Sequence, residues 1–444
     1  MRFLTPEEVA AWSAFPQPAA GSDLAAPLKR DLQATGQMTK AQVAGRNFPI
    51  GCVNLEITQR CNLDCTLCYL SDNAEAIRDL PMPEVLRRVA RIRDHYGPGT
   101  NVQISGGDPT MRARDDLIAT ARAIAEHQMV PSLLTNGIKA TRSLLKALAE
   151  AGLKDVVFHV DLTQERKGYA TEAELNAVRR DYIERARGLG LRILFNTTVF
   201  GGNVAQMPDL VRFFVAHARD LHMVSFQMQA DTGRGVIRER DDRVSVERMI
   251  EDIRAATGVQ LSFDMPQIGH SRCNRYSSML ISGSDRRALY EPQNYFIRLL
   301  AAAQEEAAAW RARRWRLGAL RVALKHPGLA FAGLRHLAAA AWTLRRGLIT
   351  TGRVDKLSFY IHNFMGADQL ERDRCQACIF MAATAEGPMS MCVYNAKREA
   401  MLAKPLQIDG TAWDPVQPAL PASRLKGRQK AAHPGNDAGG SQQP

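Results

Sequence analysis

The chain has 444 residues, of which 45% are hydrophobic and 23% charged, a composition that fits a globular protein and excludes a collagen-like or wholly disordered chain. Its longest apolar runs fall short of the ~18 residues that cross a bilayer. The net charge is +12, and the stretch from Arg311 to Arg353, with ten Lys or Arg and no Asp or Glu, supplies +10 of it. Such a basic block favours an anionic partner, whether phospholipid, nucleic acid or acidic protein.

The first residues, Met1–Glu8, predict a capped helix and not a secretory signal, within a helical N-terminal extension over residues 1–48. We therefore expect a cytoplasmic protein of enzyme size. In a reducing compartment the eight cysteines are not expected to pair as disulfides.

Residues 49–240 alternate short β-rich runs with helical periodicity, six times over. Repeated alternation of this kind predicts an α/β fold of parallel βαβ units, and both a partial barrel and an open sheet fit it. Helical periodicity falls at 82–95, 113–127, 141–150, 171–188 and 206–218. The expected strands are Val53–Thr58, Val102–Ser105, Ser132–Thr135, Val156–Val160, Arg192–Val199 and Met223–Gln229.

Beyond residue 240 the rhythm changes. Residues 241–284 continue with one more helix and strand, expected within 245–265, and contain Cys273. Residues 285–354 form a basic, Ala-, Leu- and Arg-rich helical insertion that is broken at His326-Pro327-Gly328. Residues 355–410 hold the last cysteines, and the Pro-, Gly- and Gln-rich residues 411–444 are expected to be a disordered tail.

Cys61, Cys65 and Cys68 place three thiols within eight residues, directly after the first expected strand. Loops that follow parallel strands lie at the carboxyl-end face of the sheet, where α/β enzymes carry out their chemistry. Iron–sulfur clusters are normally held by four cysteine thiolates, so three leave one iron open to another molecule. A zinc site with a distant fourth ligand, or three incidental thiols, are the alternatives. Because structural zinc needs a closed tetrahedral set, we favour the iron–sulfur cluster.

This CxxxCxxC loop resembles the signature of the radical SAM superfamily, although Leu67 stands where members often have an aromatic residue. Further matches follow each later strand: a GGEP-like element, a TNG-like element, and two polar residues where members often hold the nucleoside of S-adenosylmethionine. The resemblance implies a partial (β/α)6 TIM-type barrel and assigns cofactor binding to Gly106, Gly107, Asp108, Pro109, Thr135, Asn136, Asp161 and Asn196.

The resemblance also implies the chemistry. S-adenosylmethionine would bind the open iron of a 4Fe-4S cluster, take one electron and yield a 5′-deoxyadenosyl radical that abstracts hydrogen from an unactivated carbon. The protein would then position the reactants and exclude water. An electron donor such as flavodoxin or ferredoxin would be the partner.

A second set of four cysteines comprises Cys273, Cys375, Cys378 and Cys392. Four thiolates fit either a closed iron–sulfur cluster or an all-cysteine zinc site. In a protein that already loads one cluster we expect an auxiliary 4Fe-4S cluster, with zinc as the alternative. Cys52 is set aside as a buried apolar side chain.

The C-terminal cysteine region is loosely similar to tetraether lipid synthase and related pterin-modifying radical SAM enzymes, through residues 361–365, 371–375 and 391–396. This similarity implies a lipid or another long apolar substrate, with carbon–carbon coupling or a related modification. The basic insertion agrees with it, because Leu334 and Leu337 share a helix face with Leu344 and Leu348, as in helices that lie on membranes.

We therefore expect the protein at the inner membrane face, with an anionic membrane surface as partner. A helical insertion that only packs on the barrel is the structural alternative. Nucleic acid is not the expected partner, because the chain has no recognisable RNA-binding module. Two other functions remain as alternatives: radical SAM modification of a pterin, peptide or RNA, and a non-catalytic zinc-binding structural protein.

Overall fold

The computed structural model describes residues 2–43, 50–71, 73–234, 244–305 and 315–416. Its centre is one sheet of eleven strands in the order β10-β9-β11-β7-β6-β5-β4-β3-β2-β12-β13. The predicted N-terminal helix is confirmed as α1 (Pro6–Ala11), in which Thr5 and Glu8 form a capping box. Helix α2 (Ala26–Ala34) and strand β1 (Gln42–Val43) complete this N-terminal part.

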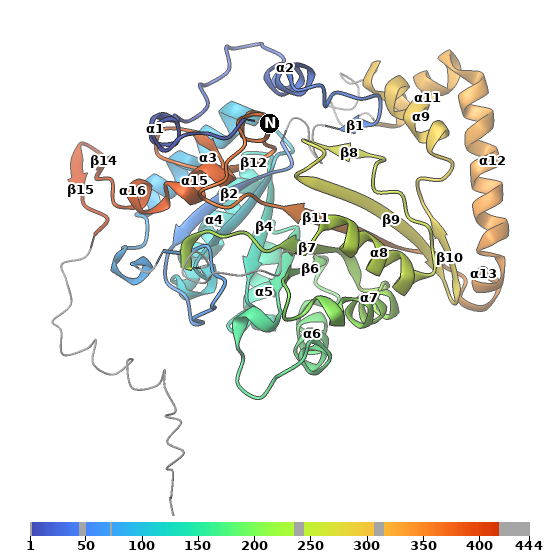
Figure 1. Cartoon of the computed structure of the whole chain (residues 1–444), viewed down its shortest axis with the longest axis horizontal. Helices are drawn as coiled ribbons and strands as arrows, with labels where there is room; N and C mark the ends of the chain where they lie inside the picture. Colours follow the sequence, from blue (N-terminus) through green and yellow to red (C-terminus); the bar gives the residue numbers. More distant parts are fainter. Residues whose placement is uncertain (1, 44–49, 72, 235–243, 306–314, 417–444) are drawn as a thin grey trace, which may run out of the picture.

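Six neighbouring parallel strands in chain order form the core of the sheet, and helices cover their outer side (Figure 1). The predicted α/β class and the (β/α)6 unit are therefore confirmed. The strands are β2 (Cys52–Thr58), β3 (Asn101–Gly106), β4 (Val130–Thr135), β5 (Asp155–His159), β6 (Arg192–Val199) and β7 (Leu221–Met228). The helices are α3 (Met82–Tyr96), α4 (Arg114–Glu126), α5 (Arg142–Glu150), α6 (Glu172–Ala186) and α7 (Met207–Ala216).

Two further strands extend the parallel run at its ends: β11 (Asp355–Asn363) pairs with β7, and β12 (Phe380–Ala383) pairs with β2. Antiparallel strands then cap both edges, namely β9 (Asn274–Ser282) and β10 (Asp285–Ala288) on one side and β13 (Pro388–Ser390) on the other. The sequence analysis did not assign these strands. In β11, buried Leu357, Phe359 and Ile361 alternate with Ser358, Tyr360 and His362 on the cavity side, which is a strand pattern, whereas β12 and β13 are too short to show one.

The barrel does not close by backbone pairing between β11 and β12 in the described part of the chain. Aromatic rings fill the seam instead. Phe380 of β12 packs edge-on against His362 and Tyr360 of β11, at ring-centroid distances of 4.8 and 6.2 Å. Side-chain packing therefore joins the two ends of the parallel run.

The segment after β7 differs from the expectation in two places. Helix α8 (Val246–Thr257) is present, but the expected strand that follows it is irregular backbone, and only the two-residue β8 (Gln267–Ile268) forms, against β1. Strand β10 lies inside the segment that was assigned to the helical insertion. The tight turn at Gly283, with φ at +55°, folds β10 back onto β9.

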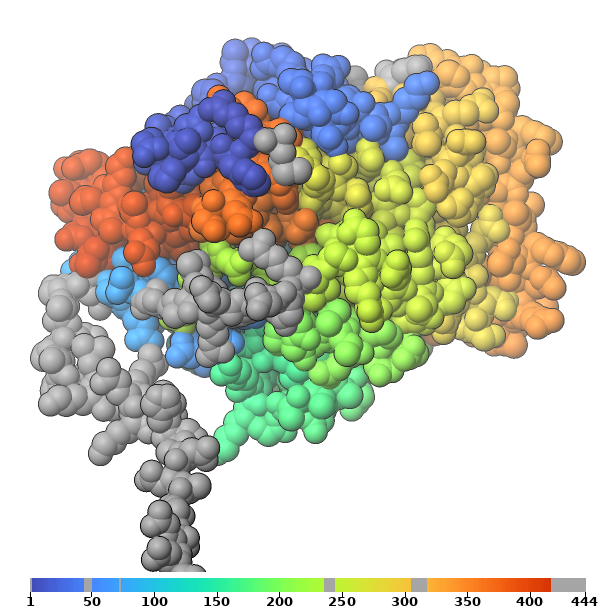
Figure 2. All heavy atoms as spheres, viewed as in Figure 1, coloured from blue at the N-terminus to red at the C-terminus, as the bar shows by residue number. Residues whose placement is uncertain are grey.

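The basic insertion is helical in α9 (Gln293–Glu305), α11 (Trp315–Lys325), α12 (Pro327–Thr343) and α13 (Arg345–Thr351). The predicted break coincides with the start of α12, whose first residue is Pro327. These helices form one end of the molecule (Figures 1 and 2). None of the helices that the structure describes is long and apolar enough to cross a membrane.

The C-terminal part returns to the first strand of the barrel through α14 (Arg372–Gln376), α15 (Met391–Ala396) and α16 (Arg398–Leu402). A small hairpin of β14 (Leu406–Ile408) and β15 (Thr411–Trp413) follows. Strand β15 lies inside the segment predicted as a tail, so the ordered chain reaches farther than expected. The rest of that prediction, residues 417–444, lies outside the described residues.

Candidate functional site

A cavity of about 1450 Å³ occupies the interior of the barrel. It extends from the loop that carries Cys61, Cys65 and Cys68, along the inner faces of the strands, to helices α9, α11 and α12. The core of a closed (β/α)8 barrel is filled by side chains, whereas this lumen is open. Its volume exceeds the roughly 300–1,000 Å³ of ordinary small-molecule sites, so it has room for two bound molecules.

Two glycines at the end of β3 hold the cysteine loop at close range. A Cβ on Gly106 would lie 1.9 Å from the carbonyl oxygen of Thr58, and one on Gly107 would lie 2.2 Å from that of Arg60. The amide of Gly107 donates to Thr58 O at 2.9 Å, and that of Asp108 donates to Arg60 O at 2.8 Å. The start of the cysteine loop is therefore fixed by backbone contacts that only glycine allows.

Asp108 is fully buried behind the cavity wall, where it orders the next loop. Its carboxylate accepts from the Thr135 hydroxyl at 2.9 and 3.0 Å, from the Asn136 amide at 2.8 Å and from the Thr110 amide at 2.9 Å. The Asn136 side chain in turn reaches Asn62 Oδ1 at 2.7 Å and Cys61 Sγ at 3.8 Å. Gly106, Gly107, Thr135 and Asn136 line the cavity, and Asp108 and Pro109 support them.

Asp161 has a similar supporting role after β5. Its carboxylate accepts from the amides of Thr163 and Thr198, at 2.9 and 2.7 Å, and contacts His159 Nε2 at 2.6 Å. Burial raises the pKa of Asp161, but the charge and hydrogen bond of His159, with the hydrogen bonds from Thr163 and Thr198, outweigh burial and lower the pKa below its ordinary value. Asp161 thus stays ionised behind the wall, while His159 and Thr198 line the cavity itself.

Asn196 of β6 is held by its neighbours on β7 and lines the cavity. Its carbonyl oxygen accepts from Ser225 at 2.7 Å, and its amide nitrogen donates to Gln227 at 3.3 Å. The structure therefore gathers the residues expected to bind the nucleotide cofactor around one lumen, although they lie on or directly after four successive strands, β3 to β6.

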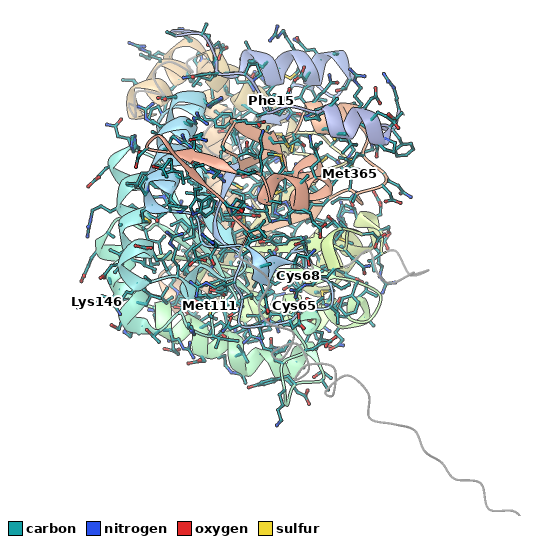
Figure 3. The ribbon with its side chains drawn as sticks, turned by 90° about the vertical axis from the view of Figure 1, so that its left-hand side faces the viewer. Phe15, Cys65, Cys68, Met111, Lys146 and Met365 are labelled. Carbon is teal, nitrogen blue, oxygen red and sulfur yellow. The ribbon has the colours of Figure 1, made fainter. Side chains whose placement is uncertain are left out.

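The three thiols of the first set lie together at the cavity wall, and Figure 3 shows Cys65 and Cys68 side by side. Burial, followed by the charge of Cys68, raises the pKa of the Cys65 thiol. Burial likewise raises the pKa values of Cys61 and Cys68. Arg166 opposes the shift at Cys65 and Arg234 opposes it at Cys68, so each has a cation that favours its thiolate form.

The donor chemistry of this set fits an iron–sulfur cluster, since three grouped thiols bind iron through sulfur and leave one position open. Among the described residues no three His, Cys, Asp or Glu side chains are arranged to hold a single metal ion. A tetrahedral zinc ion would need its sulfur ligands about 2.3 Å away. A larger iron–sulfur cluster holds its thiolates farther apart.

A buried ion pair anchors the cysteine loop from below. Arg398 of α16 donates to both carboxylate oxygens of Glu56 on β2, at 2.7 and 2.6 Å, and both side chains are less than 5% exposed. The Arg398 guanidinium also lies 4.5 Å from the ring centre of Tyr69 and 4.9 Å from that of Tyr394. The Tyr69 hydroxyl donates to Gly106 O at 2.7 Å. One arginine therefore links the C-terminal region to both sides of the CxxxCxxC loop.

The second cysteine set gathers next to the seam of the barrel. Arg374 donates through Nε to Cys273 Sγ at 3.1 Å and through Nη1 to Glu371 at 3.1 Å. Burial raises the pKa of Cys273 to about 11 even with this cation beside it. Burial raises the pKa of Cys375 as well, and the charges of Cys392, Cys378 and Cys273 add to the shift, so the four thiols are neighbours. Four grouped thiols with one arginine fit a closed cluster of the kind expected.

The sequence analysis did not identify the residues that hold the loop of Cys61, Cys65 and Cys68 in place. Glu56, Tyr69 and Arg398 stand in three separate segments, and no local spacing connects them. The only sequence signal was Glu56, the one charged residue of the expected strand Val53–Thr58. Cys52, expected to be a buried apolar side chain, is buried and also lines the cavity.

Comparison with known proteins gives a family match: residues 55–214 match the model described as Radical SAM superfamily. A Methanocaldococcus jannaschii protein named 7,8-dihydro-6-hydroxymethylpterin dimethyltransferase is 28% identical over 187 residues, which are 41% of this chain and 37% of that protein. A Pyrococcus abyssi protein named probable GTP 3′,8-cyclase is 31% identical over 168 residues, which are 37% of this chain and 53% of that protein. The chain thus spans about half, or less, of these relatives' length.

Among solved structures, Streptococcus suis SuiB bound to the precursor peptide SuiA matches with a TM-score of 0.36 and 19% identity. The match covers 47% of this chain and 46% of that one. At this TM-score the two folds are alike only in part. The family assignment therefore rests on the sheet described above and on the family match.

Gly107→Ala is expected to displace the cysteine loop, because the new methyl group would meet the Arg60 carbonyl. We expect a loss of about 1–3 kcal/mol in the free energy of unfolding, as for other overpacked sites. Urea denaturation followed by circular dichroism measures it. Gly328→Ala is the matched control, since a Cβ there meets nothing within 4 Å. Equal stability of both variants would contradict the close-approach argument.

Arg398→Met is expected to leave Glu56 charged, buried and without its cation. Breaking a buried pair in this way costs about 3–5 kcal/mol. The control is Arg187→Met, which breaks ion pairs of an arginine whose side chain is 46% exposed, and there we expect about 0–1 kcal/mol. Urea midpoints compare the two, and a similar small loss in both would show that Arg398 does not anchor the region.

Proposed function

The chain belongs to the radical SAM superfamily through residues 55–214, and from this premise we propose that it is an enzyme that cleaves S-adenosylmethionine and modifies a lipid or another long apolar substrate. The observation that carries the proposal is the single large cavity, which is shared by the three loop cysteines and by the apolar helices of the insertion. The proposed reaction is hydrogen abstraction followed by carbon–carbon coupling or a related modification.

A 4Fe-4S cluster on Cys61, Cys65 and Cys68, when bound, supplies the electron that splits S-adenosylmethionine into methionine and a 5′-deoxyadenosyl radical. The protein's own part is positioning. Gly106 and Gly107 line the space proposed for the methionyl end, and Thr135, Asn136 and Asn196 line the space for the nucleoside. Asp108 and Asp161 act behind them by fixing the loops that they share.

An auxiliary 4Fe-4S cluster on Cys273, Cys375, Cys378 and Cys392 is the second part of the proposal, with zinc as the alternative at that set. Cys273 contacts Arg374, and such an arginine would offset the negative charge of a four-thiolate site. A small iron–sulfur protein or a flavodoxin is the proposed electron donor.

The inner wall next to the insertion supports an apolar substrate. α9 contributes Leu299, Leu300 and Ala303, and the following helices complete the wall with Ala319, Val322, Ala323, Leu329, Ala330 and Gly333. Aliphatic side chains of this kind bind hydrocarbon through buried area.

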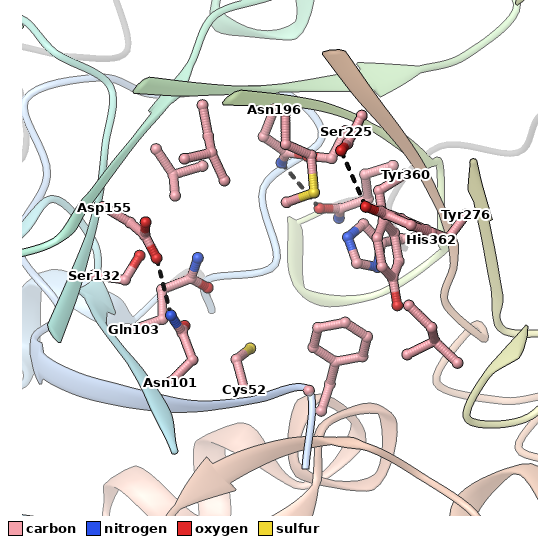
Figure 4. A pocket seen from close by; sticks show the side chains of 18 of the residues that line it. Cys52, Asn101, Gln103, Ser132, Asp155, Asn196, Ser225, Tyr276, Tyr360 and His362 are labelled. Atoms are coloured by element: carbon pink, nitrogen blue, oxygen red, sulfur yellow. Dashed lines mark hydrogen bonds between the residues drawn. The ribbon is translucent and has the colours of Figure 1, made fainter. Parts of the chain in front are cut away.

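The alternative substrate class is a pterin, peptide or RNA. It draws support from the polar opposite wall, where the Asn101 amide donates to Asp155 Oδ2 at 3.0 Å and Gln103 and Ser132 lie beside them (Figure 4). The names of the relatives, with their pterin and GTP, point to the same alternative.

The outer face of the insertion supports an anionic membrane as partner. Exposed apolar side chains project from α11 to α13, among them Leu324, Trp342 and Ile349, which are 73%, 69% and 84% exposed. Exposed basic residues accompany them, and each cation near an anionic leaflet adds on the order of 1 kcal/mol. The basic residues are Arg321, Lys325, Arg335, Arg345, Arg346 and Arg353. Leu344 departs from the predicted stripe, because it is buried where α12 ends.

Anaerobically purified and reconstituted protein is expected to carry about eight iron and eight sulfide per chain, as two four-iron clusters require. With S-adenosylmethionine and a strong reductant it should release 5′-deoxyadenosine, which liquid chromatography quantifies. Cys65→Ala should abolish this release, because the cluster that binds the nucleotide loses a ligand. Cys375→Ala, the matched variant in the second set, should retain release while losing about four iron.

Colourless protein that holds zinc without sulfide would instead favour the structural zinc protein. Iron and sulfide with no 5′-deoxyadenosine from the wild type would contradict the proposed cleavage directly.

Flotation tests the membrane partner. The full chain should float with vesicles that contain anionic phosphatidylglycerol and should stay behind with neutral phosphatidylcholine vesicles, because the proposed contact is partly electrostatic. Replacing Arg335, Arg345 and Arg346 by Glu should abolish flotation while leaving 5′-deoxyadenosine release unchanged. Wild-type protein that fails to float with anionic vesicles would remove the membrane from the proposal.

A further inference from the structure

Tyr276 of β9 stands on the cavity wall within a cluster of hydroxyl groups. Ser278 Oγ donates to the Tyr276 hydroxyl at 3.0 Å, and Ser358 Oγ of β11 lies 3.0 Å from the same oxygen. The Tyr290 ring lies 6.1 Å from the Tyr276 ring, and the two serine oxygens lie 2.9 Å apart. When Ser278 and Ser358 both donate to Tyr276, the hydrogen of Tyr276 is left for an acceptor in the cavity.

The positive charge of Lys356 on β11 also acts on the Tyr276 hydroxyl. Burial raises the pKa of Tyr276, but the positive charge of Lys356 and the hydrogen bonds from Ser278 and Ser358 outweigh burial and lower it. A buried tyrosine without such neighbours shifts the other way, as Tyr96 does, because burial raises its pKa. The neighbours of Tyr276 therefore stabilise the negatively charged form of its hydroxyl oxygen relative to the neutral phenol.

A continuous aromatic path leads from Tyr276 to the second cysteine set. The Tyr276 ring lies 5.8 Å from Tyr360, and Tyr360 stacks on His362 at 4.2 Å. His362 packs edge-on against Phe380 at 4.8 Å, and the Cys378 thiol donates to Phe380 O at 3.0 Å. Figure 4 shows Tyr276, Tyr360 and His362 together on one wall of the cavity.

We propose that Tyr276 is a redox-active residue that donates a hydrogen atom from its hydroxyl to a carbon radical held in the cavity. The Tyr276 O–H bond breaks, a C–H bond forms on the acceptor, and Tyr276 is left as a neutral phenoxyl radical. It would regain one electron, along Tyr360 and His362, from the iron–sulfur cluster that Cys273, Cys375, Cys378 and Cys392 would hold, and one proton from solvent past Lys356. The inference rests on the proposed radical chemistry and assigns the residue that ends it.

The local contacts suit this role at each stage. The Ser278 and Ser358 hydroxyls can hydrogen-bond to the Tyr276 oxygen before and after the hydrogen leaves, so little rearrangement is needed. Lys356 is exposed, so it connects the hydroxyl groups around Tyr276 with water. Tyr295 also lines the cavity, and its ring packs on Phe296 and His336, so it is a cavity tyrosine with different neighbours and serves as the control.

The first experiment uses protein without clusters and reads the phenol directly. Ultraviolet absorbance during alkaline titration should show one tyrosine that ionises below about pH 10, the ordinary value. Tyr276→Phe should remove this group, Lys356→Met should move it to higher pH, and Tyr295→Phe should leave it unchanged. A titration curve that Tyr276→Phe does not alter in this range would overturn the assigned surroundings of Tyr276.

The second experiment uses the reconstituted enzyme with S-adenosylmethionine and titanium(III) citrate in D2O, without added substrate. The nucleoside radical is then the acceptor, and 5′-deoxyadenosine should carry one deuterium taken from the exchanged Tyr276 hydroxyl. Tyr276→Phe should lose this label while Tyr295→Phe keeps it, as mass spectrometry measures. Freeze-quenched samples should show a phenoxyl signal in electron paramagnetic resonance, which narrows with ring-deuterated tyrosine and decays more slowly in Tyr360→Phe.

The outcomes separate the two proposals. Unlabelled 5′-deoxyadenosine from the wild type, or the same label in Tyr276→Phe, would overturn the role of Tyr276 and leave the proposed function standing. No 5′-deoxyadenosine at all would overturn the proposed function, and the role of Tyr276 with it.

Discussion

The buried pair between Glu56 and Arg398 is the contact on which the arrangement of the site depends. It joins the first strand of the barrel to a helix more than three hundred residues later in the chain, with bonds of 2.6 and 2.7 Å. Because Arg398 also lies over Tyr69, whose hydroxyl holds Gly106, the same cation fixes the cysteine loop against the neighbouring strand. A buried charge without its partner is costly, so the C-terminal region has one stable position relative to this loop.

That position sets where the barrel ends meet. Strand β12 enters beside β2 and faces β11 across a seam packed with aromatic rings. Because side chains and not a hydrogen-bonded ladder join the two ends, the lumen stays wide and the cavity reaches about 1450 Å³. The second cysteine set sits at the same seam, so the features that close the barrel also bring those thiols near the cavity.

Much of this architecture was accessible from sequence, and the reasons for the rest are physical. The (β/α)6 unit and the cysteine loop follow from local periodicity and local spacing, which single segments carry. Strand β9 was missed because serines occupy buried positions in it, so that it lacks apolar alternation. Strand β11 was missed although Leu357, Phe359 and Ile361 alternate with polar or aromatic residues, the pattern that predicts a strand. The supporting roles of Asp108 and Arg398 depend on partners distant in sequence, and one chain without its fold gives no pairing between them.

The helices of the insertion carry apolar side chains on two faces, one that lines the cavity and one that is exposed. In α11, Ala319, Val322 and Ala323 line the cavity, while Leu320 and Leu324 face outward. In α12, Ala330 and Gly333 face inward, while Leu334 and Leu337 are exposed. A helix that is apolar on both sides is usually buried on both sides. The inner face is covered by the barrel, and the outer face, with its flanking arginines, has the composition of a helix at a membrane surface.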